Sequence, residues 1–124
     1  MSFPNPSAIR KQSTLLSVAN PNRDGQGTTP TCFTGAAAGT TVEKINLKAL
    51  VATTKGRVLL FLHDGTNFAP WKEIQVPEIK NISDGAFEFE LEVEEDLPSA
   101  SWTIRACTER GEQIEITITG VDYT

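Results

Sequence analysis

The sequence contains few of the residues from which catalytic and metal sites are usually built. Its 124 residues include one histidine and two cysteines, and these three match no familiar zinc-ligand spacing. The loop at residues 20–27, NPNRDGQG, offers Asn20, Asn22 and Asp24 as oxygen ligands. It has one carboxylate and lacks the acidic residue that closes an EF-hand loop. We therefore expect no metal, no cofactor and no catalytic residues.

Clusters of basic residues and long apolar stretches are also missing. The formal net charge is −5 and the 11 lysines and arginines are scattered, which disfavours nucleic-acid binding because phosphate contacts need clustered basic residues. No stretch approaches the length that spans a bilayer, and residues 1–12 have no apolar core of the signal-peptide type. The sequence therefore predicts synthesis and folding in the cytoplasm, with neither nucleic acid nor a membrane as partner.

The two cysteines, Cys32 and Cys107, each lie in a strand-like segment. Because no secretory signal is evident, the favoured interpretation is a pair of reduced and buried thiols. A disulfide between neighbouring strands is the alternative.

What the sequence does contain is a series of short segments with β-strand patterns. The clearest is AFEFELEVE at residues 86–94, in which apolar and acidic residues alternate strictly. A period of two places alternate side chains on opposite faces of a strand. We expect Phe87, Phe89, Leu91 and Val93 to point inward and the glutamates to point outward.

Residues 58–62, VLLFL, are apolar on both faces, which is typical of a strand that is covered on both sides. A turn is expected at residues 63–66, HDGT. Residues 41–54 alternate with one wet face, and Lys55–Gly56 is predicted to join them to the next strand as a hairpin.

These patterns predict an all-β protein of about eight strands. The expected strands are residues 13–19, 28–34, 41–54, 58–62, 68–76, 86–94, 102–108 and 112–120. Their spacing favours a two-sheet antiparallel β-sandwich with jelly-roll or Greek-key connections. The predicted organisation is an extended N-terminal arm at residues 1–12 and a single β-sandwich domain at residues 13–124.

The arm is predicted because Pro4 and Pro6 fix the local backbone and remove amide donors. A frayed terminus is the alternative. If the arm lies on a partner subunit, Phe3 and Ile9 are its anchors. The candidate partner-binding residues of the whole chain are Phe3, Ile9, Arg10, Lys11 and Trp71.

His63 and Asp64 are adjacent, as a catalytic pair could be, but no nucleophile accompanies them. Followed by Gly65, they are ordinary hairpin-turn residues, and a structural role is favoured.

Trp71, next to Lys72 and close to a turn, is the aromatic residue that a sugar-binding module would use if it is exposed.

The acidic row from Glu88 to Glu94, continued by Glu95 and Asp96, is the strongest charge feature of the chain. A glycosidase pair needs two carboxylates that face each other across a cleft, and a flat strand face does not provide this. The favoured interpretation is a solvated strand face whose neighbours are Lys44, Lys48 or Arg105. An acidic patch for a basic partner subunit is a further interpretation.

Several segments together resemble small β-sandwich virion proteins of tailed bacteriophages. The resemblance is carried by SVANPNRDGQGT, GTTVEKINLKALVATTKGRVLLFLHDGTN, WKEIQVP and SWTIRACTE, which span most of residues 17–110. It implies a non-enzymatic virion structural protein, such as an auxiliary (decoration) protein of the capsid. The implied partners are the major capsid protein or other virion subunits, including further copies of this chain. A carbohydrate-binding module of a tail or fibre, with Trp71 and the 20–27 loop in host attachment, is the alternative.

Overall fold

The computed structural model describes residues 6–123. It contains eight strands and one short 3-10 turn, η1 (Ile82–Asp84), and no α-helix is present in this range. The strands are β1 (Pro6–Leu16), β2 (Thr31–Thr34), β3 (Thr40–Ala49), β4 (Gly56–His63), β5 (Phe68–Val76), β6 (Glu88–Leu97), β7 (Thr103–Thr108) and β8 (Ile114–Tyr123). The described part of the chain includes no helix of the length and apolar character that crossing a membrane requires.

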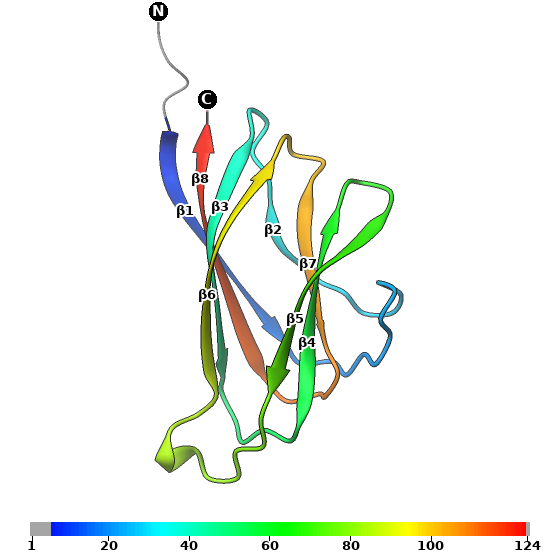
Figure 1. The fold of residues 1–124 in the computed structure, drawn as a ribbon, viewed down its shortest axis with the longest axis vertical. Helices are drawn as coiled ribbons and strands as arrows, with labels where there is room; N and C mark the ends of the chain where they lie inside the picture. The colour runs from blue at the N-terminus through cyan, green and yellow to red at the C-terminus, as the bar shows by residue number, and fades with distance from the viewer. Residues whose placement is uncertain (1–5, 124) are drawn as a thin grey trace, which may run out of the picture.

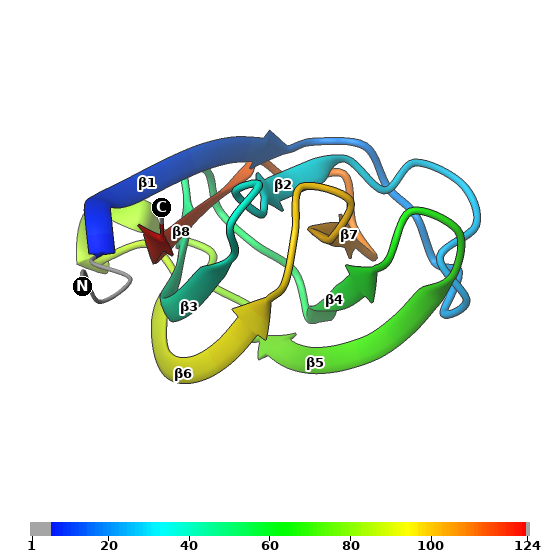
Figure 2. The same ribbon diagram turned by 90° about the horizontal axis from the view of Figure 1, so that it is seen from above.

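The strands form two antiparallel sheets of four, stacked face to face (Figures 1 and 2). Sheet A has the order β1-β8-β3-β6, and sheet B has the order β2-β7-β4-β5. The predicted all-β sandwich of about eight strands is therefore confirmed. The edge strands are β1 and β6 in sheet A, and β2 and β5 in sheet B.

The main core lies between the sheets and is built from the inward faces that the period of two creates. Sheet A contributes Ile45, Leu47 and Ile116, all fully buried, and sheet B contributes Val58 and Leu60. The predicted inward row of β6 faces this core, because Phe89 pairs in register with Leu47 and is on its face. Phe89 is nevertheless 38% exposed, since β6 is an edge strand with one neighbour.

The predicted hairpin between residues 41–54 and the next strand is wrong. β3 lies in sheet A and β4 lies in sheet B, so residues 50–55 carry the chain from one sheet to the other. The physical reason lies in the outer faces of the two strands. β3 has a wet outer face, with Lys48 exposed, whereas the outward Leu59 and Phe61 of β4 are buried. Two strands with such different outer faces belong to sheets with different surroundings.

The N-terminal region also differs from the expected arm. Residues 6–12, which the sequence predicted as part of that arm, belong to β1 and pair with β8 in continuous register from Ala8 onward. Proline at the very start of an edge strand removes no ladder hydrogen bond that the sheet needs. The strand therefore begins at Pro6, and residues 1–5 are outside the described part of the chain.

Candidate functional site

The outer faces of the two sheets differ: among residues 6–123, an apolar cluster lies under cover on the outer face of sheet B, whereas the outer face of sheet A is polar. On it, Leu59, Phe61 and Cys107 are buried and pack with Phe68; these four residues are called the outer cluster below. The rings of Phe61 and Phe68 meet edge to face with centroids 5.7 Å apart, a favourable aromatic geometry. A second, smaller core thus lies on the side of sheet B that faces away from sheet A.

The segment between β1 and β2, residues 17–30, covers this outer cluster. The cover is close, because a Cβ atom placed on Gly25 would lie 2.4 Å from the Phe68 ring. Gly25 also has a positive φ of 85°, which glycine adopts without strain. The thiol of Cys107 lies 3.9 Å from the carbonyl oxygen of Asn22 on the same segment. The prediction that residues 58–62 are covered on both sides is therefore confirmed.

The buried amide of Asn20 holds the covering segment in shape. Its Nδ2 donates to the carbonyl oxygens of Gln26 and Thr28, each at 2.9 Å, and its Oδ1 accepts from the backbone N–H of Asn22 at 3.0 Å. The carboxylate of Asp24 accepts from the Gln26 N–H at 2.9 Å. Side-chain acceptors that close local turns are the usual use of asparagine and aspartate in loops. The residues considered as calcium ligands thus bind their own backbone.

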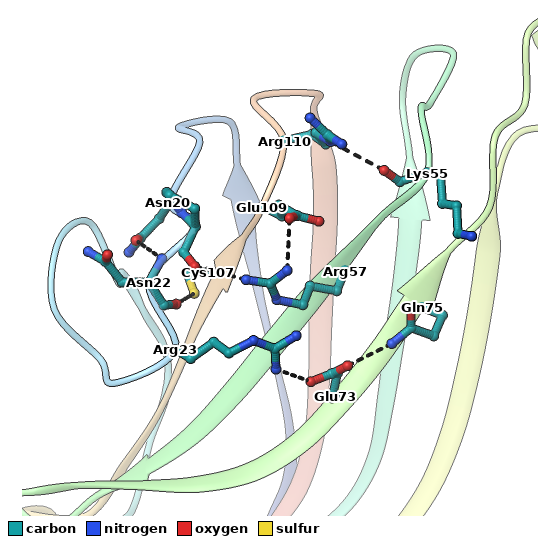
Figure 3. A network of polar contacts seen from close by, with 11 residues as sticks. Asn20, Asn22, Arg23, Lys55, Arg57, Glu73, Gln75, Cys107, Glu109 and Arg110 are labelled. Carbon is teal, nitrogen blue, oxygen red and sulfur yellow. Dashed lines mark hydrogen bonds and ion pairs between the residues drawn. The ribbon is translucent and has the colours of Figure 1, made fainter.

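Charged side chains tie the covering segment to the strands beneath it (Figure 3). Arg23 pairs with Glu73 of β5 at 2.6 Å, and Gln75 donates to the other oxygen of the same carboxylate at 2.7 Å. The bond from Arg23 is the main reason that the pKa of Glu73 lies below its ordinary value. Arg57 of β4 donates to Glu109 and to the carbonyl oxygen of Pro21, both at 2.8 Å.

Two hollows lie side by side on this face and share Arg23 and Glu73 in their walls. The first, about 340 Å³, has an apolar lining that includes Leu59, Pro70 and Trp71. The second, about 250 Å³, is lined mainly by charged residues. Its members are Arg23, Lys55, Gly56, Arg57, Glu73, Gln75, Glu109 and Arg110. The two are called the apolar hollow and the basic hollow, and together they form the binding groove.

Trp71 owes its place in the groove to a β-bulge. In the β4–β5 register, Leu60 is opposite Lys72 and Phe61 is opposite Pro70, so Trp71 is the extra residue. A bulge re-aims a side chain that the regular pleat would point elsewhere. The indole is partly buried against the main core, and the ammonium of Lys72 lies 5.7 Å from its ring centroid. The sequence predicted a bulge near residues 69–70, one residue from where it occurs.

The other predicted partner-binding residues are far from this groove. Ile9 and Lys11 are exposed on the outer face of β1, at an edge of sheet A, and Ile9 is 72% exposed. Arg10 points the other way and binds Asp122 through two hydrogen bonds, at 2.8 and 3.0 Å. Phe3 lies outside the described residues. Trp71 is thus on a different sheet from Ile9, Arg10 and Lys11 and does not share a surface with them.

His63 and Asp64 shape the turn between β4 and β5. The Nδ1 of His63 accepts from the Gly65 N–H at 3.2 Å, and the ring packs against Phe68. The carboxylate of Asp64 accepts from the N–H groups of Thr66 and Asn67 at 2.9 and 2.8 Å. These two backbone hydrogen bonds lower the pKa of Asp64. The hydrogen bonds of both side chains are thus those of a turn, and the ring of His63 adds packing against Phe68.

The acidic row lies on the exposed face of β6, as the alternation predicted. Glu90 pairs with Lys44 at 2.8 Å, which confirms a solvated face with a basic neighbour. Lys48 is opposite Glu88 in register, whereas Arg105 is on sheet B and lies over Phe68. Across residues 6–123, no group of three or more histidine, cysteine, aspartate or glutamate side chains converges as a metal site would require.

Sequence reasoning did not find Arg23, Arg57, Glu73 and Glu109 as members of one site. They come from the covering segment, β4, β5 and the turn that follows β7, and no local pattern links them. One signal was available: a strand that is apolar on both faces needs a cover, and the long loop before β2 was free to provide it.

Both cysteines are free and buried, as favoured from sequence. Burial raises the pKa of Cys32 to about 12 and also raises that of Cys107.

Comparisons with known proteins give little further information. No family model matches the chain, and comparison with curated proteins gives no match either. Among solved structures, the chain is similar to one in "Structure of infectious bursal disease virus Gt strain", with 11% sequence identity and a TM-score of 0.34. The alignment covers 97% of this chain and 32% of that one, so this chain spans about a third of the length of the solved chain. A likeness of this degree carries no argument about function.

Proposed function

We propose that this protein is a non-enzymatic structural component of a bacteriophage virion, an auxiliary (decoration) protein that binds the capsid lattice. Its partners in this proposal are the major capsid protein or other virion subunits. It folds in the host cytoplasm and then joins the particle through the binding groove on sheet B.

One observation carries the proposal: apart from β3, which belongs to sheet A, the segments that resemble phage virion proteins meet on sheet B. SVANPNRDGQGT lies in the covering segment, GRVLLFLHDGTN is β4 with its turn, and WKEIQVP lies mostly in β5. SWTIRACTE contains β7. These four segments supply nearly all of the outer cluster and the binding groove. The resemblance therefore includes this surface as well as part of the main core.

The form of the groove suits attachment to another protein. Interfaces between proteins usually combine an apolar, often aromatic centre with a polar rim. Here Trp71, Pro70 and Leu59 provide the apolar part, and Arg23, Lys72 and Glu73 surround it. A tryptophan that a bulge holds in place loses little conformational freedom when a partner covers it.

The direct test is to look for the protein in the particle. An antibody raised against the purified protein is used on gradient-purified virions and on the soluble fraction of the infected host. The proposal expects a signal that co-migrates with capsids in many copies per particle. Detection in the soluble fraction alone would rule out a virion component.

A specific observation also favours the alternative, a carbohydrate-binding module of a tail or fibre. This alternative needs Trp71 and the 20–27 loop to lie close together. Trp71 and one residue of that loop, Arg23, line the same apolar hollow. An aromatic ring that is accessible beside polar side chains is the usual platform for a sugar, and the indole of Trp71 is partly exposed. A glycan array separates the two functions: a sugar-binding module gives specific signals that Trp71→Ala removes, whereas a decoration protein gives none.

A further inference from the structure

The basic hollow is unusual in a protein with a net charge of −5. Four of the chain's 11 basic residues, Arg23, Lys55, Arg57 and Arg110, line it, against two carboxylates. Arg23 and Arg57 are engaged with those carboxylates, Glu73 and Glu109 (Figure 3). The hollow therefore has two positive charges in excess.

Lys55 and Arg110 carry this excess charge. Both side chains are exposed, and neither makes an ion pair with any residue in the 6–123 range. Arg110 donates its Nε to the carbonyl oxygen of Lys55 at 3.2 Å, which keeps the two residues together. A Cβ on Gly56 would lie only 3.0 Å from the Arg110 side chain, so this close packing depends on glycine. Figure 3 shows that Arg110 meets the backbone of Lys55 while the Lys55 side chain extends away from it, so the two cations line one hollow at separate points, and neither has an ion-pair partner in the 6–123 range.

The matching negative surface is on the same chain but on the other sheet. On β6, Glu88, Glu90, Glu92 and Glu94 are exposed and project from the outer face of sheet A. In the described part of the chain, Glu90 alone of these four has an ion-pair partner, Lys44. β6 is also an edge strand whose one neighbour is β3. Lys44 and Lys48 are opposite Glu92 and Glu88 in register, so two lysines face a row of four carboxylates and the row keeps an excess of negative charge.

We propose that the basic hollow of one copy binds the acidic row on β6 of a second copy. The two surfaces are on different sheets, so the contact joins unlike surfaces. In a pair of copies, the acidic row of one copy and the basic hollow of the other stay free. Contacts of this head-to-tail kind produce closed rings or open chains of subunits. The inference goes beyond the proposed function, because it concerns contacts between copies through the basic hollow, whereas attachment to the capsid is argued from Trp71 and the apolar hollow.

The charges involved are exposed, so the association is weak in free solution and sensitive to salt. It gains strength when copies are placed side by side on a surface, because the local concentration is then high. Sedimentation equilibrium of the purified protein is expected to show concentration-dependent association. The association constant is expected to fall about tenfold or more between roughly 50 mM and 500 mM salt.

Two charge-reversed variants test the pairing of these particular surfaces. Lys55→Glu with Arg110→Glu reverses the hollow, and Glu92→Lys with Glu94→Lys reverses the row. Each variant alone is expected to associate about tenfold more weakly than the wild type. An equimolar mixture of the two variants is expected to associate again, as species that contain both.

The matched control combines all four substitutions in one chain, which restores the net charge of −5. Association of this four-residue variant at the wild-type level supports the contact, because the two surfaces have exchanged charge and still match. The proposal is overturned if the wild type stays monomeric at low salt. It is equally overturned if the variants associate like the wild type, or if neither the mixture nor the four-residue variant regains association. Circular dichroism verifies that each variant is folded.

Discussion

Arg10 and Asp122 join the two ends of the described chain within sheet A. Besides its two bonds to Asp122, the Arg10 guanidinium donates to the carbonyl oxygen of Thr34 and lies 4.3 Å from the centroid of Phe33. Asp122 also accepts from the Thr40 hydroxyl at 2.7 Å. One arginine therefore connects β1, β2 and β8 at the edge where the two sheets approach each other.

This ion pair makes part of the stability depend on pH. The hydrogen bonds from Arg10 are the main cause that lowers the pKa of Asp122 below its ordinary value. A carboxyl group whose pKa is lowered by folding contributes stability above its unfolded pKa, about 3.9, and this contribution disappears as the pH falls through the folded value. We expect Asp122→Asn to reduce the free energy of unfolding by about 1–3 kcal/mol at pH 7.

Urea unfolding at a series of pH values measures this effect. The difference between the wild type and Asp122→Asn is expected to narrow steadily below about pH 4. Asp96→Asn, which removes an exposed carboxylate on the same sheet, is the control and should change stability much less. A difference that stays constant down to about pH 2 would contradict this role for Asp122.

Gly25 is the residue on which the cover of sheet B depends. Gly25→Ala is expected to destabilise the protein by about 2–3 kcal/mol, because the backbone has a positive φ and the new methyl group meets the Phe68 ring. The cover should also loosen and expose Cys107, so one thiol per chain should react faster with a disulfide reagent. Cys32, which is fully buried in the main core, should remain unreactive.

Gly85→Ala is the matched control for this substitution. Gly85 also has a positive φ, 108°, but no atom lies within 4 Å of the position that its Cβ would take. Gly85→Ala is expected to lower the free energy of unfolding by about 1 kcal/mol, from backbone strain alone, and to leave the reactivity of the Cys107 thiol unchanged. Equal effects of the two substitutions would show that the contact with Phe68 is unimportant.

At the scale of elements, the sequence predicted strands well where the period of two is strong. β5 was predicted with the observed bounds, Phe68–Val76, and the alternation of β6 correctly assigned the two faces of that strand. Which strands pair was less predictable. The loop at residues 50–55 crosses between sheets instead of forming a hairpin, and Leu50 donates its N–H to Gln113, far along the chain. Such long-range contacts leave no local pattern in a sequence.

β1 is the element whose removal best tests the account of the N-terminus. Residues 6–12 form 7 of its 11 residues and include Arg10. Deleting residues 1–12 is therefore expected to lower the free energy of unfolding by about 3 kcal/mol or more, because ladder hydrogen bonds and the Arg10 contacts are lost together. Deleting residues 1–5 leaves β1 complete and is the control, with an expected change within about 0.5 kcal/mol.

Thermal and urea unfolding of both deletions provide the measurement. An unchanged stability after deletion of residues 1–12 would mean that this segment is an arm independent of the sandwich, as the sequence first suggested.

At the scale of the whole molecule, the sandwich has two unlike outer faces. Sheet A presents a polar face with threonine, lysine and glutamate side chains, whereas sheet B is covered by residues 17–30 and hollowed by the binding groove. The sequence identified Trp71 as a candidate, and it showed that β4 needed a cover. It did not predict the contact between Arg23 and Glu73, because these two residues are 50 positions apart in the chain.

The central claim is that the binding groove on sheet B attaches this protein to a virion. Co-sedimentation of the purified protein with assembled capsids that lack it tests this claim most directly, with Trp71→Ala compared with the wild type. The account predicts saturable binding by the wild type and binding weakened about tenfold or more by Trp71→Ala, while Ile9→Ala, an exposed apolar residue on sheet A, binds normally. Saturable binding that Trp71→Ala leaves unchanged, or no binding by the wild type, would contradict it.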